Sequence, residues 1–257
     1  MLHFAQACDC HARLWNPGSA AERALYDETA AAQGLERVVF VHPDGQRPDH
    51  GPLTDLLKTR RDSARGVARV SLLTPDSTIE QMQLDGVRGL RLVFSEDADP
   101  SAAAGELVEL TWRAARRRCH VELDAPAGLL AALAPAIRDA PCVMVIDRMA
   151  GVRARLGLDQ IGVDDILDLL AAGRVWVKLT GAEALAQASG DGWAGLAIMR
   201  ALIATNADCL VWGSEWPGDA ASALEVLVEA CGDAGVLRRI LVANPARLYG
   251  FSGAGSV

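Results

Sequence analysis

Eight short apolar segments rich in β-branched residues recur along the chain, and longer stretches with helical spacing separate them. Each segment is apolar on both faces and is followed by polar or turn residues, which is typical of a fully buried parallel strand. The predicted strands are 5–10, 36–41, 66–73, 87–94, 119–123, 142–147, 174–179 and 209–213. The clearest helical stretches are 101–117, 126–138, 162–172 and 193–206. The chain therefore alternates between strand and helix along its length.

Helix boundaries in this pattern carry local signals. Ser101 and Asp219 are predicted N-caps, because their short oxygen-bearing side chains accept the unpaired N–H groups of a first helical turn. Gly34, Gly86 and Gly173 fall where a helix should end before the next strand.

The number of strands decides the fold class. Eight strands alternating with helices is the count of a closed β/α barrel, and such barrels run to about 250 residues as one domain. A doubly wound open sheet fits the same alternation, but it predicts a glycine-rich phosphate loop after an early strand, which this sequence lacks. We therefore predict an α/β protein made of a single (β/α)8 TIM barrel over residues 1–257.

Composition narrows the class of protein. The net charge of −8 disfavours a nucleic-acid or anionic-membrane partner, because those partners select a basic face. Six cysteines without paired CxxC spacing favour buried reduced thiols over a disulfide framework. The first residues show neither a basic start nor a long apolar stretch, so we expect no secretory signal and a cytoplasmic location. Oligomeric state stays open, a homo-oligomer included.

Ionisable residues gather at the carboxyl ends of the predicted strands, where the working residues of such barrels lie. They are His11, Arg13, His42, Arg91, His120, Glu122, Asp147, Arg148, Lys178 and Glu215. This concentration is the strongest purely physical indication of a site. Structural alternatives stay open: Lys178 could pair with Glu122 inside the barrel, and His42 could hydrogen-bond a loop. His120 is expected to face a helix, out of phase with Glu122.

Eight motifs at these strand ends resemble the amidohydrolase-2 family, and within it the branch that contains 2-pyrone-4,6-dicarboxylate lactonase. In chain order they are DCHARLW, GLERVVFVHP, GVRGLRLVF, HVELDA, VMVIDRMAG, VWVKLTGAEAL, LVWGSEWPG and RILVANPARLYGF. They follow the family order and cover nearly the whole chain. The resemblance implies a hydrolase built on a TIM barrel.

The chain departs from the family where the metal ligands and catalytic groups usually stand. The family's His-x-His, Asp-His, Tyr-Arg and GSDWP aspartate correspond here to His11-Ala12-Arg13, Asp147-Arg148, Glu183-Ala184 and Glu215. Of these usual ligand and catalytic positions, only His11 is unchanged.

The two arginines change the expected metal chemistry. Arginine has no acceptor atom and stays protonated, so neither Arg13 nor Arg148 can ligate an ion. Each would repel a unit charge at 4 Å by roughly 4 kcal/mol in an effective dielectric near 20, and a divalent cation by about twice that. We therefore predict no tightly bound metal. The remaining set that could hold a divalent ion such as zinc is His11, Glu122 and Glu215.

Loss of the metal does not remove catalysis, because the resemblance implies lactonases that are regarded as metal-independent. We predict hydrolysis of a small carboxylated lactone or related cyclic ester. Glu215 is the predicted general base, His11 polarises the carbonyl or relays a proton, and Arg148 stabilises an oxyanion. The residues predicted to bind the small anionic substrate are Arg13, Arg91, His42, Glu122 and Lys178.

Two other functions stay open. Related barrels include decarboxylases and other lyases, although their usual site relies on a metal. The third possibility is an inactive barrel that serves as a binding or scaffold protein. Convergence of Arg13, Arg148 and Glu215 around an open pocket would favour an enzyme, whereas a saturated salt-bridge network without a cavity would favour the scaffold.

Overall fold

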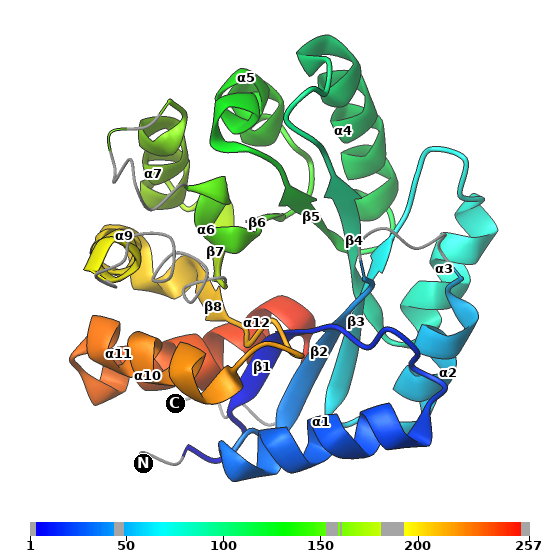
Figure 1. The fold of residues 1–257 in the computed structure, drawn as a ribbon. Helices are drawn as coiled ribbons and strands as arrows, with labels where there is room; N and C mark the ends of the chain where they lie inside the picture. The colour runs from blue at the N-terminus through cyan, green and yellow to red at the C-terminus, as the bar shows by residue number, and fades with distance from the viewer. Residues whose placement is uncertain (1–3, 44–48, 153–158, 160, 181–192, 253–257) are drawn as a thin grey trace.

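Eight parallel strands, each hydrogen-bonded to the next along the chain, form a nearly closed barrel (Figure 1). The structure, a computed structural model, describes residues 4–43, 49–152, 159, 161–180 and 193–252. The strands are β1 Cys8–Ala12, β2 Arg37–Val41, β3 Ala64–Arg69, β4 Val87–Val93, β5 His120–Asp124, β6 Met144–Ile146, β7 Val175–Leu179 and β8 Leu210–Trp212. A bridge between Ala12 and Trp216 brings the first and last strand ends together. The predicted (β/α)8 TIM barrel is confirmed.

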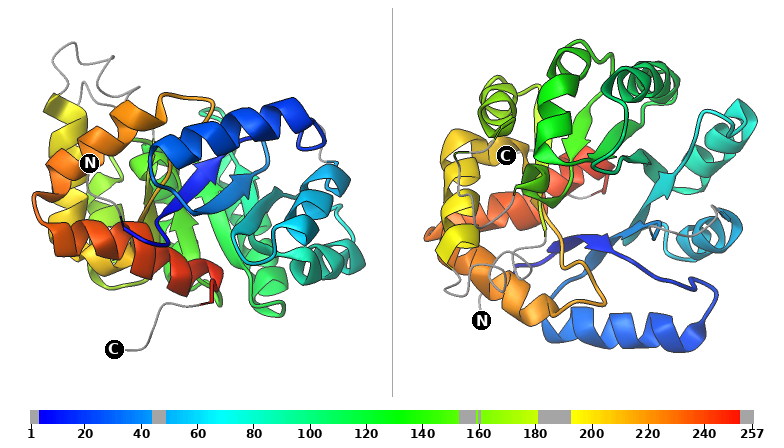
Figure 2. Two further views of the ribbon diagram at one scale, coloured as in Figure 1. Left: turned by 90° about the horizontal axis from the view of Figure 1, so that it is seen from below. Right: turned by 45° about the horizontal axis from the view of Figure 1, so that its top comes forward.

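Helices surround the barrel on its outer side (Figures 1 and 2). They are α1 Ala20–Ala32, α2 Gly51–Thr59, α3 Asp76–Asp85, α4 Pro100–Ala115, α5 Ala127–Arg138, α6 Arg148–Gly151, α7 Val163–Ala171, α9 Trp193–Asn206, α10 Ala220–Cys231, α11 Ala234–Arg238 and α12 Asn244–Tyr249, with short turns η2 Ala207–Cys209 and η3 Arg239–Ala243. Within the described residues, no helix has the length and apolar character to cross a membrane.

Most of the predicted helix boundaries agree with the structure. The Asp219 side chain caps α10 as predicted, accepting two backbone N–H groups. The Ser101 prediction is wrong: Asp99 caps α4, and Pro100 occupies the first turn, where its missing N–H costs nothing. The three predicted helix terminators have positive φ, namely Gly34, Gly86 and Gly173.

The end of the barrel interior where the strands begin is apolar. The C-terminal segment of the chain closes this end. Inward-facing residues of the strands, such as Cys10, Val39 and Val145, form one buried cluster with Tyr249 and Phe251. Figure 2 shows α12, which contains Tyr249, lying across this end of the barrel. The opposite end, where the strands finish, is therefore the end available for a site.

His120 belongs to this closed end, and its predicted orientation is wrong. Residues two apart in a strand share a face, so His120 points into the barrel with Glu122. There its ring packs edge-on against Tyr249, with ring centroids 5.3 Å apart. It also fills the space beside Gly89, where an added Cβ would come within 2.2 Å of Nε2. Burial lowers the pKa of His120 to about 4, from 6.5 for an ordinary histidine.

This lowered pKa predicts a pH dependence of stability. Between pH 6.5 and about 4 the unfolded chain binds a proton at His120 and the folded chain does not. The free energy of unfolding should therefore fall as pH drops through this window, by roughly 3 kcal/mol in total. In urea unfolding at a series of pH values, His120→Gln should remove this part of the slope. A slope equal to that of the wild type would contradict the buried neutral histidine.

Candidate active site

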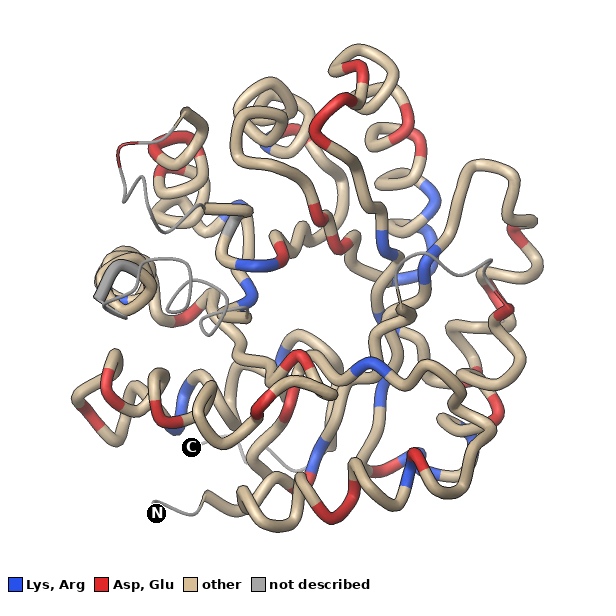
Figure 3. The backbone as a smooth tube through the Cα atoms, in the orientation of Figure 1, with Lys and Arg blue, Asp and Glu red and all other residues tan. Residues whose placement is uncertain are grey.

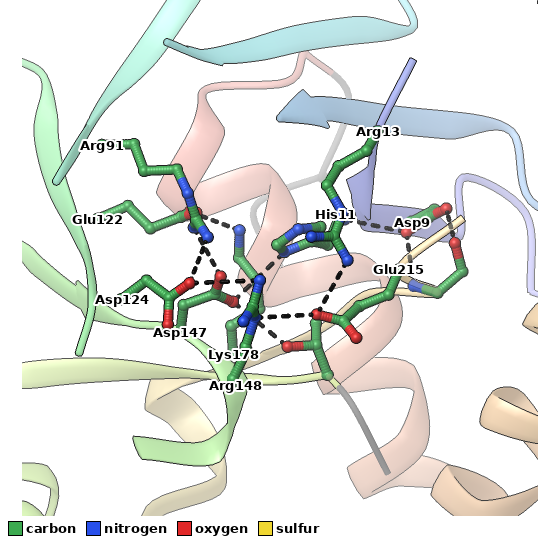
Figure 4. A network of polar contacts seen from close by, with 12 residues as sticks. Asp9, His11, Arg13, Arg91, Glu122, Asp124, Asp147, Arg148, Lys178 and Glu215 are labelled. Atoms are coloured by element: carbon green, nitrogen blue, oxygen red, sulfur yellow. Dashed lines mark hydrogen bonds and ion pairs between the residues drawn. The ribbon is translucent and has the colours of Figure 1, made fainter. Parts of the chain in front are cut away.

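Acidic and basic residues occupy backbone positions around the centre of the barrel (Figure 3). The close-up in Figure 4 shows them in contact. The bases are Arg13, Arg91, Arg148 and Lys178, and the acids are Glu122, Asp124, Asp147 and Glu215. The charges of the two sets balance, so this group as a whole carries no uncompensated charge.

Four of these side chains form an inner network: Arg91, Glu122, Asp147 and Lys178, all with no exposed side-chain surface. Lys178 Nζ lies 2.5 Å from Glu122 Oε2, so the predicted interior pair exists. Arg91 donates to the other oxygen of Glu122, to Asp147 Oδ2 at 2.6 Å and to the neighbouring Asp124 at 2.8 Å. Burying these charges is costly, and the network offsets the cost by bringing opposite charges into direct contact.

The inner network keeps its carboxyl groups ionised. Burial by itself raises the pKa of Glu122, but Lys178 and Arg91 more than offset this, and the pKa lies below its usual value. Burial acts on Asp147 in the same way, yet the charges of His11 and Arg91 hold its pKa well below the usual range. Both residues are therefore carboxylates at neutral pH.

His11 adjoins this network from the end of β1. Its Nδ1 lies 3.3 Å from Asp147 Oδ1, so the carboxylate stabilises positive charge on the ring. Both ring nitrogens are buried and neither has a hydrogen-bond partner among the described residues, but Nε2 also lies on the side away from Asp147. A buried nitrogen without a partner is costly, which makes Nε2 the natural contact for a bound molecule.

Asp9 fixes the position of His11. One of its oxygens accepts the backbone N–H groups of His11 and Ser214, at 3.0 and 2.9 Å. The other accepts the Ser214 hydroxyl at 2.6 Å and the Tyr26 hydroxyl at 3.2 Å. At Gly213 an added Cβ would come within 2.3 Å of the Cβ of His11. Asp9 and Gly213 therefore hold the ends of β1 and β8 together.

Glu215, Arg13 and Arg148 form an outer bridge at the mouth of the barrel. Glu215 Oε1 lies 3.5 Å from Arg13 Nη2 and 3.4 Å from Arg148 Nε. These side chains are partly exposed, at 20, 18 and 40%. Arg148 and Glu215 also have positive φ, 48° and 55°, a strained conformation that clusters at functional sites.

An open cavity adjoins the outer bridge. It has a volume of about 780 Å³ and is lined by Arg148, Asp124 and the first residues of α5. Arg13, Arg148 and Glu215 thus converge on one another, and of the three Arg148 lines the open cavity.

The structure separates the predicted substrate-binding residues into three places. Arg13 lies in the outer bridge, whereas Arg91, Glu122 and Lys178 lie beneath it with no exposed side-chain surface. The ring of His42 packs against His50 beside a small cavity of about 130 Å³. Substrate contact by each of these residues stays a prediction. Glu183 and Ala184 lie outside the described residues.

Sequence reasoning gave no role to three acidic residues of this site: Asp9, Asp124 and Asp147. Asp124 follows Glu122 by two positions and so shares its inward face, a signal that was readable from the sequence. Asp147 was visible next to Arg148 but was given no role. Asp9 offered no such signal, because two of its partners, Tyr26 and Ser214, are 17 and 205 positions away.

The spacing of three potential ligands would allow a metal ion to bind, but the neighbouring positive charges oppose it. Ligand atoms of His11, Glu122 and Asp147 lie within 4.8 Å of one another. Asp147, rather than the predicted Glu215, completes this set. However, Lys178 and Arg91 already occupy both oxygens of Glu122 and one oxygen of Asp147 at hydrogen-bond distance. A divalent ion would have to displace buried cations, so these residues do not suit tight binding.

Comparison with known proteins places the chain in a family. A family model described as amidohydrolase matches residues 8–251, and the chain belongs to this family. A 4-sulfomuconolactone hydrolase of Hydrogenophaga intermedia is 28% identical over 246 residues, covering 88% of this chain and 78% of the relative. A 2-pyrone-4,6-dicarboxylate hydrolase of Comamonas testosteroni is 26% identical over 275 residues, covering 95% and 90%.

Solved structures agree with the family. A candidate 2-pyrone-4,6-dicarboxylic acid hydrolase of Pseudomonas putida superposes with a TM-score of 0.86 at 26% identity, covering 97% of this chain and 99% of that one. An organophosphorus hydrolase of Deinococcus radiodurans, at a TM-score of 0.59 and 15% identity over 95% of this chain and 92% of that one, shares the fold alone.

The inner network predicts a large and non-additive effect on stability. Lys178→Met leaves Glu122 buried with half of its compensation, and should lower the free energy of unfolding by roughly 3–5 kcal/mol. Adding Glu122→Gln should restore part of that loss, measured by denaturant unfolding as a double-mutant cycle. Arg200→Met, which removes an exposed pair with Glu229, is the control and should cost about 1 kcal/mol or less. Strictly additive losses would contradict the coupling.

Proposed function

We propose that the protein hydrolyses a small lactone or related cyclic ester that carries a carboxylate or similar anionic group, without a tightly bound metal. The observation that carries the proposal is the outer bridge, in which Glu215 meets two arginines, one of which, Arg148, lines an open cavity. The relatives named as sulfomuconolactone and pyrone-dicarboxylate hydrolases support the same substrate class.

In this proposal the arginines bind and His11 assists. Arg13 and Arg148 present planar guanidinium groups that suit a carboxylate or an oxyanion. His11 Nε2, buried and without a partner among the described residues, contacts the lactone carbonyl oxygen. Asp147 at 3.3 Å stabilises positive charge on the ring while negative charge develops on that oxygen.

Glu215 acts as general base. It takes a proton from a water molecule whose oxygen attacks the carbonyl carbon, forming a tetrahedral oxyanion that His11 and Arg148 stabilise. The ring C–O bond then breaks, and its oxygen receives a proton. One lactone and one water yield one open-chain hydroxy acid. The cations of the inner network and outer bridge supply the positive charge that a metal supplies in other members of the family.

The alternatives receive less support. The relatives named as lactone hydrolases weigh against the inactive scaffold, and no observation favours a decarboxylase or lyase. We propose a small anionic molecule as the only substrate class, with no nucleic-acid or membrane partner. The cytoplasmic location and a homo-oligomer remain predictions.

The test is a screen of carboxylated and sulfonated lactones, including 2-pyrone-4,6-dicarboxylate and 4-sulfomuconolactone. For any lactone that is hydrolysed, Glu215→Gln should lower kcat by about 100-fold or more, because the amide cannot accept the proton. Glu80→Gln, on the exposed side of α3, is the matched control and should leave kcat unchanged. Full turnover by Glu215→Gln would remove the proposed base.

A further inference from the structure

The outer bridge holds Glu215, the proposed base, in contacts that differ from the hydrogen-bonded ion pairs of the inner network. A single oxygen of Glu215, Oε1, faces both guanidinium groups, at 3.5 and 3.4 Å. That oxygen is buried and accepts no hydrogen bond from the described part of the chain. Both contacts are therefore ion pairs without hydrogen-bond geometry.

The ion pairs of the inner network, in the same site, are shorter and more buried than those of the outer bridge. There the given distances between charged atoms are 2.5 to 2.8 Å, and the side chains of Arg91, Glu122 and Lys178 have no exposed surface. In the outer bridge the distances are longer and the side chains are 18 to 40% exposed. Ion pairs of the second kind contribute little to stability, so another anion can replace one partner at low cost.

Charge crowding determines which partner leaves. Arg148 already contacts Asp124 as well as Glu215, with 3.4 Å to each. An anionic substrate bound by Arg13 and Arg148 would be a third negative group at these two cations. Like charges at contact distance repel strongly at a partly buried site. Asp124 is also held by Arg91, which leaves Glu215 as the group able to move.

We propose that the outer bridge is a latch that the anionic group of the substrate opens. This group takes the place of Glu215 between Arg13 and Arg148, and the released carboxylate turns to the attacking water. The inference rests on the proposed function and narrows it: the substrate carries its negative charge close to the ester carbonyl, and neutral lactones leave the base engaged.

The latch accounts for a glutamate where the family has aspartate. Glu215 has a positive φ of 55°, and rotation of its side chain changes the position of its carboxylate. Glutamate has one more rotatable bond than aspartate, and it reaches both the arginines and a water beside the carbonyl.

The latch is tested by binding, without turnover. Phthalate, a dicarboxylate that cannot be hydrolysed, is titrated into each variant at fixed pH and salt by calorimetry. Glu215→Gln removes the competing carboxylate and should bind phthalate about 5-fold or more tightly than the wild type, while turnover falls. Arg13→Gln and Arg148→Gln should each weaken binding about 10-fold, because each removes one charge-assisted contact.

Two controls separate the latch from general electrostatics and from misfolding. Glu96→Gln removes a carboxylate that lines the cavity beside Arg148, outside the outer bridge, and should change phthalate affinity less than about 2-fold. Thermal melting establishes that each variant is folded. Equal or weaker phthalate binding by folded Glu215→Gln would overturn the latch, as would an equal gain for Glu96→Gln.

The outcome is distinguishable from that of the proposed function. If no lactone is hydrolysed but Glu215→Gln binds phthalate more tightly, the anion exchange stands and the lactonase proposal fails. If lactones are hydrolysed and Glu215→Gln gains no affinity, the lactonase proposal stands and the latch fails.

Discussion

The contact of one buried carboxylate with two buried cations is the interaction on which the site depends. Glu122 faces Lys178 with one oxygen and Arg91 with the other, and these side chains come from β5, β7 and β4. Without this compensation the centre of the barrel would hold charges that cannot be solvated. With it, ion pairs join β4, β5 and β7 beneath the outer bridge.

Everything nearer the mouth builds on this inner network. Asp147 shares Arg91 with Glu122 and lies beside Nδ1 of His11, and we propose that the other ring nitrogen, Nε2, contacts the reactant. Asp9 and Gly213 close β1 against β8 and thereby fix both His11 and the segment that leads to Glu215. The strained backbone at Glu215 persists because the barrel around it is rigid. The fully buried ion pairs of the inner network therefore lie beneath the partly exposed ion pairs of the outer bridge.

The barrel itself was predictable, because buried parallel strands and helices have different periods, and all eight strands were found. The first strand begins three residues later than predicted and extends to Ala12, with an irregular register between Asp9 and Ala12. His120 was predicted on the wrong face of its strand. It is two positions from Glu122 and therefore shares the face of Glu122, which the sequence alone indicates.

The sequence predicted which side chains lie at the carboxyl end of the barrel better than which partners those side chains contact. Arg91 stands opposite Glu122 in the register of β4 and β5, yet the burial of Arg91 and Lys178 depends on how the barrel closes. The same holds for Asp9, whose partners lie in distant segments. Local pattern places a residue at a strand end, whereas the partner it meets is decided by register and closure.

The central claim is that side-chain cations take the place of a metal at this site, and elemental analysis of the purified protein tests it most directly. The protein is measured as isolated and after incubation with zinc or manganese followed by removal of excess ion. We predict metal far below one equivalent per chain in both cases, because Arg91 and Lys178 occupy the carboxylates. A near-stoichiometric metal would contradict the claim and show that the buried cations yield to an ion.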